Sequence, residues 1–389
     1  MAEGPAQRKA LFACSLFWGS PFVVGSHHLA RHLAARGWQV AFVSFPITPA
    51  HVALGEASYL PQRFAVYRRG GGYDLGGHLW HYVPGALAAP ADAPGLRNRW
   101  VHRHWPRLTV PNVVTTVRRQ GFAAVDLLYF DNPYQLFWLD AVDYRRSVYR
   151  IADNYQGLPF ATPAFDEMER ELARRVVTVL YTATTLAPRV ATLGPRTARH
   201  FPNGVDDSFL EERDYRPPPQ YAAIPAPRVV YLGAMDRWFD YALTNRTTAA
   251  FPGVSFVFIG PNRTAQQRME RRPNVHLLGP VDHTLVPSLL AHAHAAIIPF
   301  DVAGYPLLVN SINPLKLYEY MACGLPVVAT AWQELRELHS PAILADSADD
   351  FVRLLEQALR DPGDHGQRRE FARRHSWHQR VDELMADLN

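Results

Sequence analysis

The chain has 389 residues, of which 48% are hydrophobic, 12% aromatic and 20% charged, with a formal net charge of +4. This length suits two α/β domains better than one, and the composition excludes a disordered or fibrous chain. The small net charge argues against a nucleic-acid-binding protein. No apolar run reaches the ~18 residues that cross a membrane, and no cleavable leader is recognisable, so we expect a cytoplasmic protein.

The first part of the chain alternates strand-like and helix-like segments. A strand at 9–17, a loop with glycines, a helix ending before Gly37 and a strand at 38–45 form a βαβ unit, which is typical of parallel sheets. We therefore predict an N-terminal Rossmann-like domain over residues 1–210. The final segment, 376–389, has helical apolar spacing and could pack back on this domain.

A proline-rich stretch follows, and its prolines predict an extended linker over residues 211–227. Residues 228–375 then show a second series of buried strands separated by helical stretches. The predicted fold class is therefore α/β, with two doubly wound parallel-sheet domains. Such domains bind ligands at the carboxyl ends of their strands, so we predict a central cleft facing both sheets.

Neither cysteine, Cys14 or Cys323, lies in a metal-binding or disulfide pattern, and no Asp-x-Asp motif occurs. We therefore expect no metal ion and no cofactor. Only two of the 40 basic residues are lysines, Lys9 and Lys316. A lysine inside a motif therefore stands out against an arginine background.

The most informative segment runs from Asn313 to Glu319. Pro314 and Leu315 open a predicted helix, and Lys316 and Glu319 lie three residues apart on one face of it. A helix N-terminus offers free N–H groups to a diphosphate, Lys316 adds a full charge, and Glu319 can accept both ribose hydroxyls. The alternative is a solvated Lys–Glu pair without a ligand.

Sugar transfer with inversion requires a base that removes the proton of the attacking hydroxyl group. Asp153 follows a predicted strand of the first domain and is the leading candidate. The alternative for Asp153 is that it caps the following turn. The alternative base is His27, or its neighbour His28, at the start of the first helix.

The region from Pro227 to Thr330, with glycine turns at Gly233 and Gly260, resembles the donor-binding half of the GT-B glycosyltransferases. The resemblance implies that the C-terminal domain binds the nucleotide sugar and that the N-terminal domain binds the acceptor. Many retaining members carry two acidic residues separated by seven. Here Glu319 fits the second position, but Ser311 occupies the first, which favours inversion.

The chain also resembles the GumK type of glucuronosyltransferase of xanthan assembly. The residues from Tyr149 to Asp153 match its strand-end pattern Tyr-Arg-x-x-Asp, and the Gly279–Val281 segment stands in place of its Gly-Glu-Met loop, without the Glu. The resemblance implies a base at Asp153, a contact of the Val281 loop with the nucleotide base, and a phosphate-binding lysine at Lys316. Glu319 stands where that enzyme type has Gln.

The predicted function is transfer of a hexose or hexuronic acid from a nucleotide-diphosphate sugar to a hydroxyl of a glycan, glycolipid or natural product, as in polysaccharide biosynthesis. UDP-sugars are favoured as donors, and GDP- or dTDP-sugars are the alternatives. A retaining GT4-like transferase and a catalytically silent nucleotide-sugar-binding partner are the alternative functions. A dinucleotide oxidoreductase is disfavoured because no G-x-G-x-x-G occurs. The predicted donor-binding residues are Gly233, Arg237, Gly260, Val281, Ser311, Asn313, Pro314, Leu315, Lys316 and Glu319.

The segment from Arg97 to Arg119 contains six arginines, Trp100, Trp105 and no acidic residue. Basic and aromatic side chains in such a mixture attract anionic lipid surfaces. This pattern predicts a peripheral contact at the inner face of the plasma membrane. A solvated basic helix and an acceptor-phosphate site are the alternatives.

Overall fold

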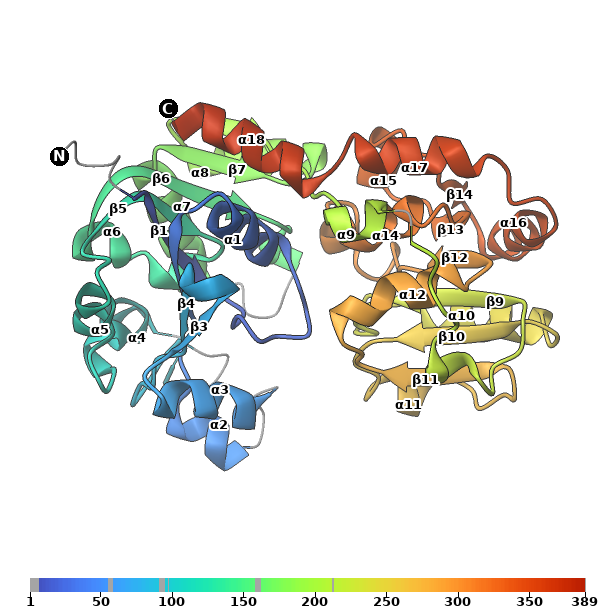
Figure 1. Cartoon of the computed structure of the whole chain (residues 1–389), viewed down its shortest axis with the longest axis horizontal. Helices are drawn as coiled ribbons and strands as arrows, with labels where there is room; N and C mark the ends of the chain where they lie inside the picture. The colour runs from blue at the N-terminus through green and yellow to red at the C-terminus, as the bar shows by residue number, and fades with distance from the viewer. Residues whose placement is uncertain are drawn as a thin grey trace. The chain divides into compact units, whose positions relative to one another are not determined.

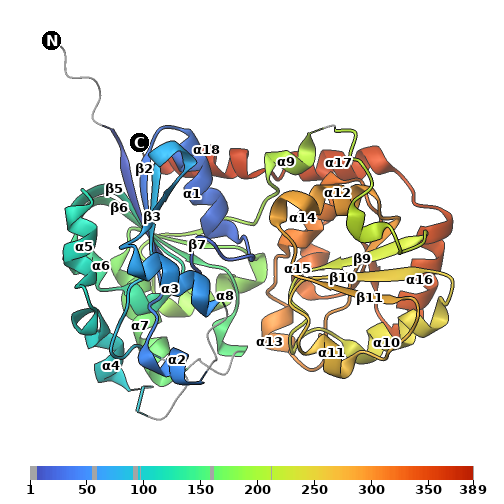
Figure 2. The ribbon, with the colours of Figure 1, turned by 60° about the horizontal axis from the view of Figure 1, so that its bottom comes forward.

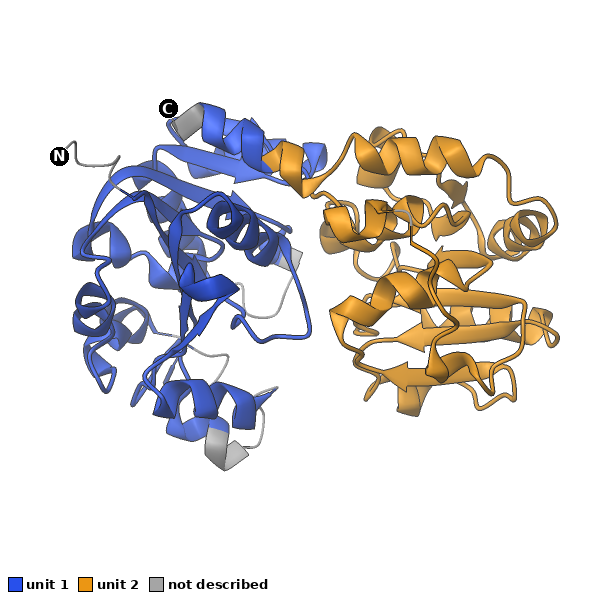
Figure 3. Cartoon of the chain, viewed as in Figure 1, with its two compact units in different colours: residues 1–202, 381–389 blue, residues 203–380 orange. Residues whose placement is uncertain are grey.

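The computed structural model of the chain divides into two compact units (Figure 3). Unit 1 comprises residues 1–202 and 381–389, and unit 2 comprises residues 203–380. Each unit is an α/β domain built on its own sheet, so the predicted fold class is confirmed (Figure 1). The residues that the structure describes are 7–54, 59–90, 95–96, 98–157, 162–211 and 213–388.

Among the described residues, the sheet of unit 1 has eight strands in the order β3-β4-β2-β1-β5-β6-β7-β8. Neighbouring strands are parallel, except that β3 pairs antiparallel with β4 at one edge. The inner strands are largely buried because helices cover both faces of such a sheet. The strands are β1 (Lys9–Cys14), β2 (Gln39–Ser44), β3 (Gly72–Asp74), β4 (Leu79–Tyr82), β5 (Ala124–Phe130), β6 (Asp143–Ile151), β7 (Thr178–Tyr181) and β8 (Ala198–His200).

The helices of unit 1 begin where the sequence offers caps. At α7, for example, the Thr162 hydroxyl accepts the N–H of Phe165 at 3.2 Å, and Pro163 occupies the first helical position. The helices are α1 (Gly25–Ala35), α2 (Pro49–Leu54), α3 (Leu60–Arg68), α4 (Arg99–His104), α5 (Val113–Arg119), α6 (Trp138–Ala141), α7 (Pro163–Arg175), α8 (Ala187–Leu193) and the larger part of α18 (Trp377–Leu388).

The strand order identifies the ligand-binding edge of unit 1. From β1 the chain builds outward through β2 to β4, then returns to add β5 on the other side of β1. The connections therefore reverse direction between β1 and β5, and ligands of open α/β sheets bind beyond the carboxyl ends of the strands at such a point.

Unit 2 repeats this scheme with six strands, in the order β11-β10-β9-β12-β13-β14 within the described part of the chain. All of these neighbours are parallel. The order in which the strands are added to the sheet reverses between β9 and β12. The strands are β9 (Arg228–Leu232), β10 (Ser255–Ile259), β11 (Val275–Gly279), β12 (Ala295–Ile298), β13 (Val327–Thr330) and β14 (Ile343–Ala345).

Helices cover both faces of the second sheet. Figure 2 shows α12, α14 and α17 on one side of the strands, and α10 and α11 on the other. Helix α16 packs against α10, and α14 packs against α17. The helices are α9 (Asp207–Leu210), α10 (Tyr241–Ala250), α11 (Ala265–Arg268), α12 (Val286–Ala291), α13 (Pro306–Val309), α14 (Leu315–Ala322), α15 (Gln333–Glu337), α16 (Ala348–Arg360) and α17 (His365–Arg373).

The unit boundary lies at Pro202, before the position 210 that the sequence suggested, and the proline-rich stretch 211–227 groups with unit 2. The physical reason is burial, because Phe209, Tyr221 and Ile224 belong to the hydrophobic core of unit 2. A stretch that is extended by its prolines can still anchor itself through its aromatic side chains.

The C-terminal helix α18 is shared between the units, which Figure 3 shows as a change of colour along it. Its residues from Val381 onward group with unit 1. There Arg36 pairs with Asp382 at 2.6 Å, and Arg199 lies 3.5 Å from Glu383. Leu384 is buried on the same helix.

Candidate functional site

The first turn of α14 lies at the point where the connections of unit 2 reverse direction, and it carries Lys316. The ammonium Nζ is 3.1 Å from the hydroxyl of Tyr231 on β9, and it lies over the rings of Tyr231 and Phe300 at 4.5 and 4.8 Å. Gly233, just past β9, lies beside it: a Cβ added there would be 3.0 Å from Nζ. The structure thus brings together Lys316 and Gly233 as predicted residues of one site.

The ammonium of Lys316 is partly buried against aromatic rings, with no carboxylate within salt-bridge distance in the described residues. Burial lowers its pKa to about 7, and Glu319 opposes this shift only in part. Cation–π contacts stabilise the charged form less than a bound anion would. A negatively charged ligand would therefore stabilise the ammonium of Lys316 at this position.

Glu319, one helical turn after Lys316, is buried, and its carboxylate lies 3.3 Å from the imidazole of His283. His283 follows β11 and begins the short 3-10 helix η7 (His283–Leu285). Lys316 and Glu319 therefore have separate surroundings, one aromatic and one polar. This arrangement argues against a solvated Lys–Glu pair.

The glycines at the ends of β9 and β10 allow two backbones to touch. A Cβ on Gly260 would lie 2.2 Å from the carbonyl oxygen of Gly233, and both residues have positive φ, 141° and 128°. An L side chain fits neither requirement. Val281 is partly buried in the loop after Gly279, where it packs against the core of unit 2.

Four further predicted donor residues lie at the start of α14 or just before it. The Asn313 side-chain oxygen accepts the N–H of Asn203 at 3.1 Å and the hydroxyl of Tyr318 at 3.0 Å, which fixes the start of α14. The Ser311 hydroxyl donates to the Leu308 carbonyl at 2.9 Å. Pro314 is the N-cap of α14, and Leu315 is its first residue.

Arg237 lies on the turn beyond Gly233, and its side chain is 46% exposed. Its guanidinium is 3.9 Å from the carboxylate of the neighbouring Asp236, which is a weak surface contact. The side chain is therefore available to a ligand. Its part in donor binding stays a prediction.

In unit 1, Asp153 lies two residues past β6, at the carboxyl edge of the sheet. Burial raises the pKa of its carboxyl group to about 6, while the charge of Arg150 lowers it in part. No hydrogen bond to its carboxylate occurs among the described residues, so it does not cap the following turn. A carboxylate with these properties is suited to accepting a proton near neutral pH.

The other carboxylate at this edge, Asp131 after β5, is fully engaged. It accepts hydrogen bonds from the Ser15 N–H at 2.7 Å, the Ser15 and Ser26 hydroxyls at 2.8 Å, and the Asn132 amide at 3.0 Å. These contacts join the ends of β1 and β5 to the first turn of α1. Asp131 therefore holds the edge together.

The alternative base, His27, has contacts at both of its ring nitrogens. It is buried on α1, its Nδ1 lies 3.4 Å from the N–H of Val24, and its Nε2 lies 3.1 Å from the carbonyl of Phe17. Its ring stacks on Trp18 at 5.6 Å. The imidazole thus closes the N-terminus of α1.

The basic segment from 97 to 119 is partly neutralised. Its first residue lies outside the described residues. Arg99 pairs with Glu167, and Arg103 pairs with Glu171 at 2.7 Å, both on α7. Trp105 is fully buried, whereas Trp100 is 58% exposed.

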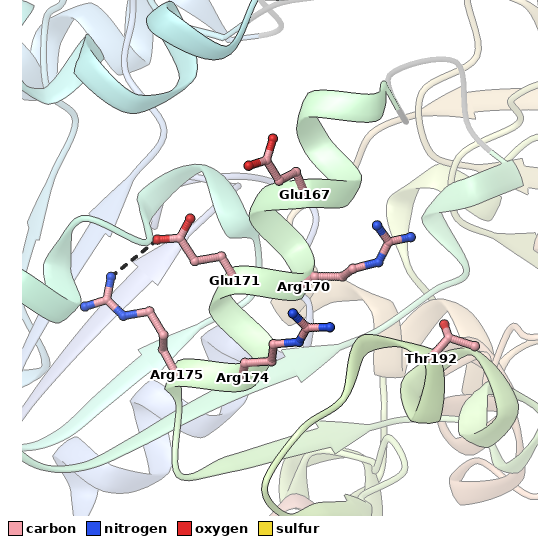
Figure 4. Close-up of a pocket in the computed structure, with 6 residues that line it drawn as sticks. All are labelled: Glu167, Arg170, Glu171, Arg174, Arg175 and Thr192. Atoms are coloured by element: carbon pink, nitrogen blue, oxygen red, sulfur yellow. Dashed lines mark ion pairs between the residues drawn. The ribbon is translucent and has the colours of Figure 1, made fainter.

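These acidic partners line an open pocket of about 770 Å³ in unit 1 (Figure 4). Its walls are charged side chains of α7 and one threonine of α8, and no predicted site residue is among them. The lining residues are Glu167, Arg170, Glu171, Arg174, Arg175 and Thr192.

Comparison with known proteins finds a match to a glycosyltransferase family in each unit. Residues 12–182 match the family described as glucuronosyltransferase GumK, N-terminal domain, and residues 226–361 match the family described as glycosyl transferases group 1. Each half of the chain is thus similar to a family of glycosyltransferases. Both predicted resemblances are thereby confirmed, and the two matched domains are those of glycosyltransferase enzymes.

A curated relative points to the same class. The putative teichuronic acid biosynthesis glycosyltransferase TuaH of Bacillus subtilis is 28% identical over 158 residues, which are 38% of this chain and 39% of the relative. The match thus spans well under half of the length of that relative.

Solved structures share the fold along the whole chain. The sucrose-phosphate synthase of Thermosynechococcus elongatus is similar with a TM-score of 0.69 and 16% identity, covering 97% of this chain and 98% of that one. HepE of Anabaena, solved with UDP and glucose, has a TM-score of 0.66 and 15% identity, covering 98% and 99%. At these identities the likeness establishes the GT-B fold.

Three residues of this site escaped the sequence analysis: Tyr231, Phe300 and His283. Tyr231 and Phe300 lie at the ends of buried strands, where aromatic side chains usually mean only core packing. His283 lies in a loop without a motif. In unit 1, Asp131 was missed in the same way, although an Asp after a buried strand is a usable signal.

Proposed function

We propose that the chain transfers a hexose or hexuronic acid from a UDP-sugar to a hydroxyl of a glycan, glycolipid or natural-product acceptor, with inversion at the anomeric carbon. The observation that carries this proposal is the environment of the Lys316 ammonium. A partly buried ammonium at a helix N-terminus, beside a buried carboxylate one turn later, fits a nucleoside diphosphate: phosphate on Lys316 and α14, ribose on Glu319.

Structures with the same fold support the choice of nucleotide. HepE of Anabaena was solved with UDP-glucose, and an Escherichia coli protein named for trehalose-6-phosphate was solved with UDP-2-fluoro glucose. We propose that Gly233 and Gly260 keep this edge of the sheet free of side chains, so that the diphosphate can approach the backbone. Lys316 and the α14 N-terminus would stabilise the leaving diphosphate, and no metal ion is needed for this charge.

For the acceptor step we propose Asp153 as the base. Its carboxylate takes the proton from the acceptor hydroxyl as the oxygen attacks the anomeric carbon. Ser311 supports inversion, because a hydroxyl that already donates to the main chain offers no acidic group to a retaining pathway.

The test is a donor screen that measures UDP release and determines the product anomer by NMR. Turnover should require a UDP-sugar, persist in EDTA and give the inverted anomer. Asp153→Asn should lose about 100-fold or more in kcat while it still binds UDP. Asp143→Asn, at the exposed opposite end of β6, is the matched control and should stay active.

Other outcomes would redirect the assignment. A retained anomer would favour the GT4-like alternative. UDP binding without turnover on any donor would indicate a silent partner of another transferase. Full activity of Asp153→Asn would remove this residue from the mechanism.

The cytoplasmic location and the membrane contact stay proposals. None of the helices in the described residues is both long and apolar enough to cross a membrane. The exposed Trp100 and the charges that are not paired with α7 are the groups left to meet lipid. Sedimentation with anionic vesicles tests this contact, and Trp100→Ala should reduce the fraction of protein that is bound to the vesicles. Equal sedimentation of the unmodified chain and the Trp100→Ala variant would refute the proposed membrane contact.

A further inference from the structure

The buried carboxylate of Glu319 has a partner that no sequence motif indicates. Nε2 of His283 lies 3.3 Å from Oε1 of Glu319, and the side chains are 22% and 11% exposed. A carboxylate can only accept in such a contact, so the imidazole donates. His283 lies 36 positions before Glu319, on the loop that follows β11.

His283 is itself held from two sides. The ring of Phe209, on α9, meets the imidazole edge-on with centroids 5.5 Å apart. The carboxylate of Asp282 accepts the N–H of Thr284 at 2.9 Å and its hydroxyl at 2.6 Å, which fixes the turn that carries His283. The imidazole is therefore a fixed point rather than a loose surface group.

A fixed partner matters to Glu319 because its side chain has three rotatable bonds. Binding two ribose hydroxyls with one carboxylate requires a single orientation, and choosing it only on binding costs side-chain entropy. A hydrogen bond to Oε1 sets the orientation beforehand and leaves Oε2 and the remaining lone pairs for the ligand.

We propose that His283 is a donor-positioning residue, which orients the Glu319 carboxylate for the ribose hydroxyls and joins it to the loop at 279–283. This inference rests on the proposed donor-binding function. The proposed phosphate-binding group has different contacts, because Lys316 Nζ lies 3.1 Å from the Tyr231 hydroxyl and over the rings of Tyr231 and Phe300. We therefore expect His283 to affect ribose binding and not phosphate binding.

The experiment compares a ligand that has the ribose hydroxyls with one that lacks them. UDP and 2′,3′-dideoxyuridine diphosphate are titrated against the full chain and its variants by calorimetry. His283→Leu should weaken UDP about tenfold, as expected for losing the orienting hydrogen bond of a charged group, and should leave the dideoxy ligand unchanged. His283→Gln, which keeps a donor, should recover part of the loss. His339→Gln, at an exposed histidine after α15, is the matched control.

A second arm uses Glu319→Gln. In that background, His283→Leu should have little further effect on UDP, because the two residues act through one contact. Equal weakening of UDP and the dideoxy ligand by His283→Leu would show a purely structural role and overturn the inference, and so would unchanged UDP binding. If the unmodified chain binds no UDP, the proposed function fails first, and this inference fails with it.

Discussion

Asp153 is a carboxylate whose burial is unfavourable for stability. Its pKa, raised to about 6 in the folded chain, lies above the ~3.9 of an unfolded Asp. The protonated carboxyl group therefore contributes stability that is fully present below pH ~4 and is lost as the pH rises through about 6.

Asp153→Asn should accordingly stabilise unit 1 at pH 7.5, by about 2 kcal/mol, and much less at pH 4. Urea unfolding at the two pH values measures the difference, with Asp143→Asn as a control. A variant that is less stable than the unmodified chain at pH 7.5 would show that the Asp153 carboxylate is stabilised by its surroundings. The trade of stability for a proton-accepting group is common at active sites.

Lys316 should couple UDP binding to proton uptake. Burial lowers its pKa to about 7, and a bound diphosphate favours the charged amine. Above pH 7 the free protein must therefore gain a proton on binding, and UDP affinity should fall up to about tenfold per pH unit. Calorimetry in buffers of different ionisation enthalpy measures the uptake.

The measurement compares the test variant Lys316→Met with the control variant Lys9→Met. Lys316→Met should bind UDP weakly, with no pH dependence above 7. Lys9 donates to the Gly121 carbonyl in unit 1, so its replacement should leave both affinity and pH dependence intact. Proton uptake that persists in Lys316→Met would assign it to another group.

The sequence could identify Lys316 and Glu319 because both lie on one helical face, three residues apart. It could not identify Tyr231, which is 85 positions from Lys316, or His283, which is 36 positions from Glu319. Contacts of that kind depend on how the strands are ordered in the sheet. Local spacing predicts which side chains share a helix face, and only the fold shows which residues from other elements contact those side chains.

At the scale of elements, the ends of β9 and β10 give a sharp prediction. Gly260→Ala would place a methyl group 2.2 Å from the Gly233 carbonyl, at a φ of 141° that alanine avoids. The free energy of unfolding of unit 2 should fall by about 2 kcal/mol or more. Gly253→Ala is the control, because a Cβ there has open space. Chemical denaturation compares the two, and equal stabilities would contradict the close approach.

Alternation of strands and helices was enough to predict two parallel-sheet domains, since parallel strands need crossover helices. The order of the strands was beyond the sequence, because any of these apolar strands can pair with any other. Burial of Tyr221 and Ile224 places the proline-rich stretch with unit 2, although its composition predicted an extended linker. Composition describes the backbone of such a stretch, whereas its few aromatic side chains decide where it packs.

For the whole molecule, the division into units predicts two unfolding transitions that respond to different changes. UDP should raise the midpoint temperature of unfolding of unit 2 alone, because UDP binds the folded state of that unit and shifts the unfolding equilibrium towards it. Leu384→Ala, on the part of α18 that belongs to unit 1, should lower the midpoint of unit 1, because removing a buried leucine side chain costs about 2–5 kcal/mol.

Scanning calorimetry with and without UDP separates these effects, and Gln379→Ala, at an exposed position on the same helix, is the control. If Leu384→Ala shifted the UDP-sensitive transition as well, the shared helix would couple the units into one cooperative system. Independent shifts would instead mean that α18 serves unit 1 as a packing element, so that UDP binding to unit 2 can be measured even when unit 1 is destabilised.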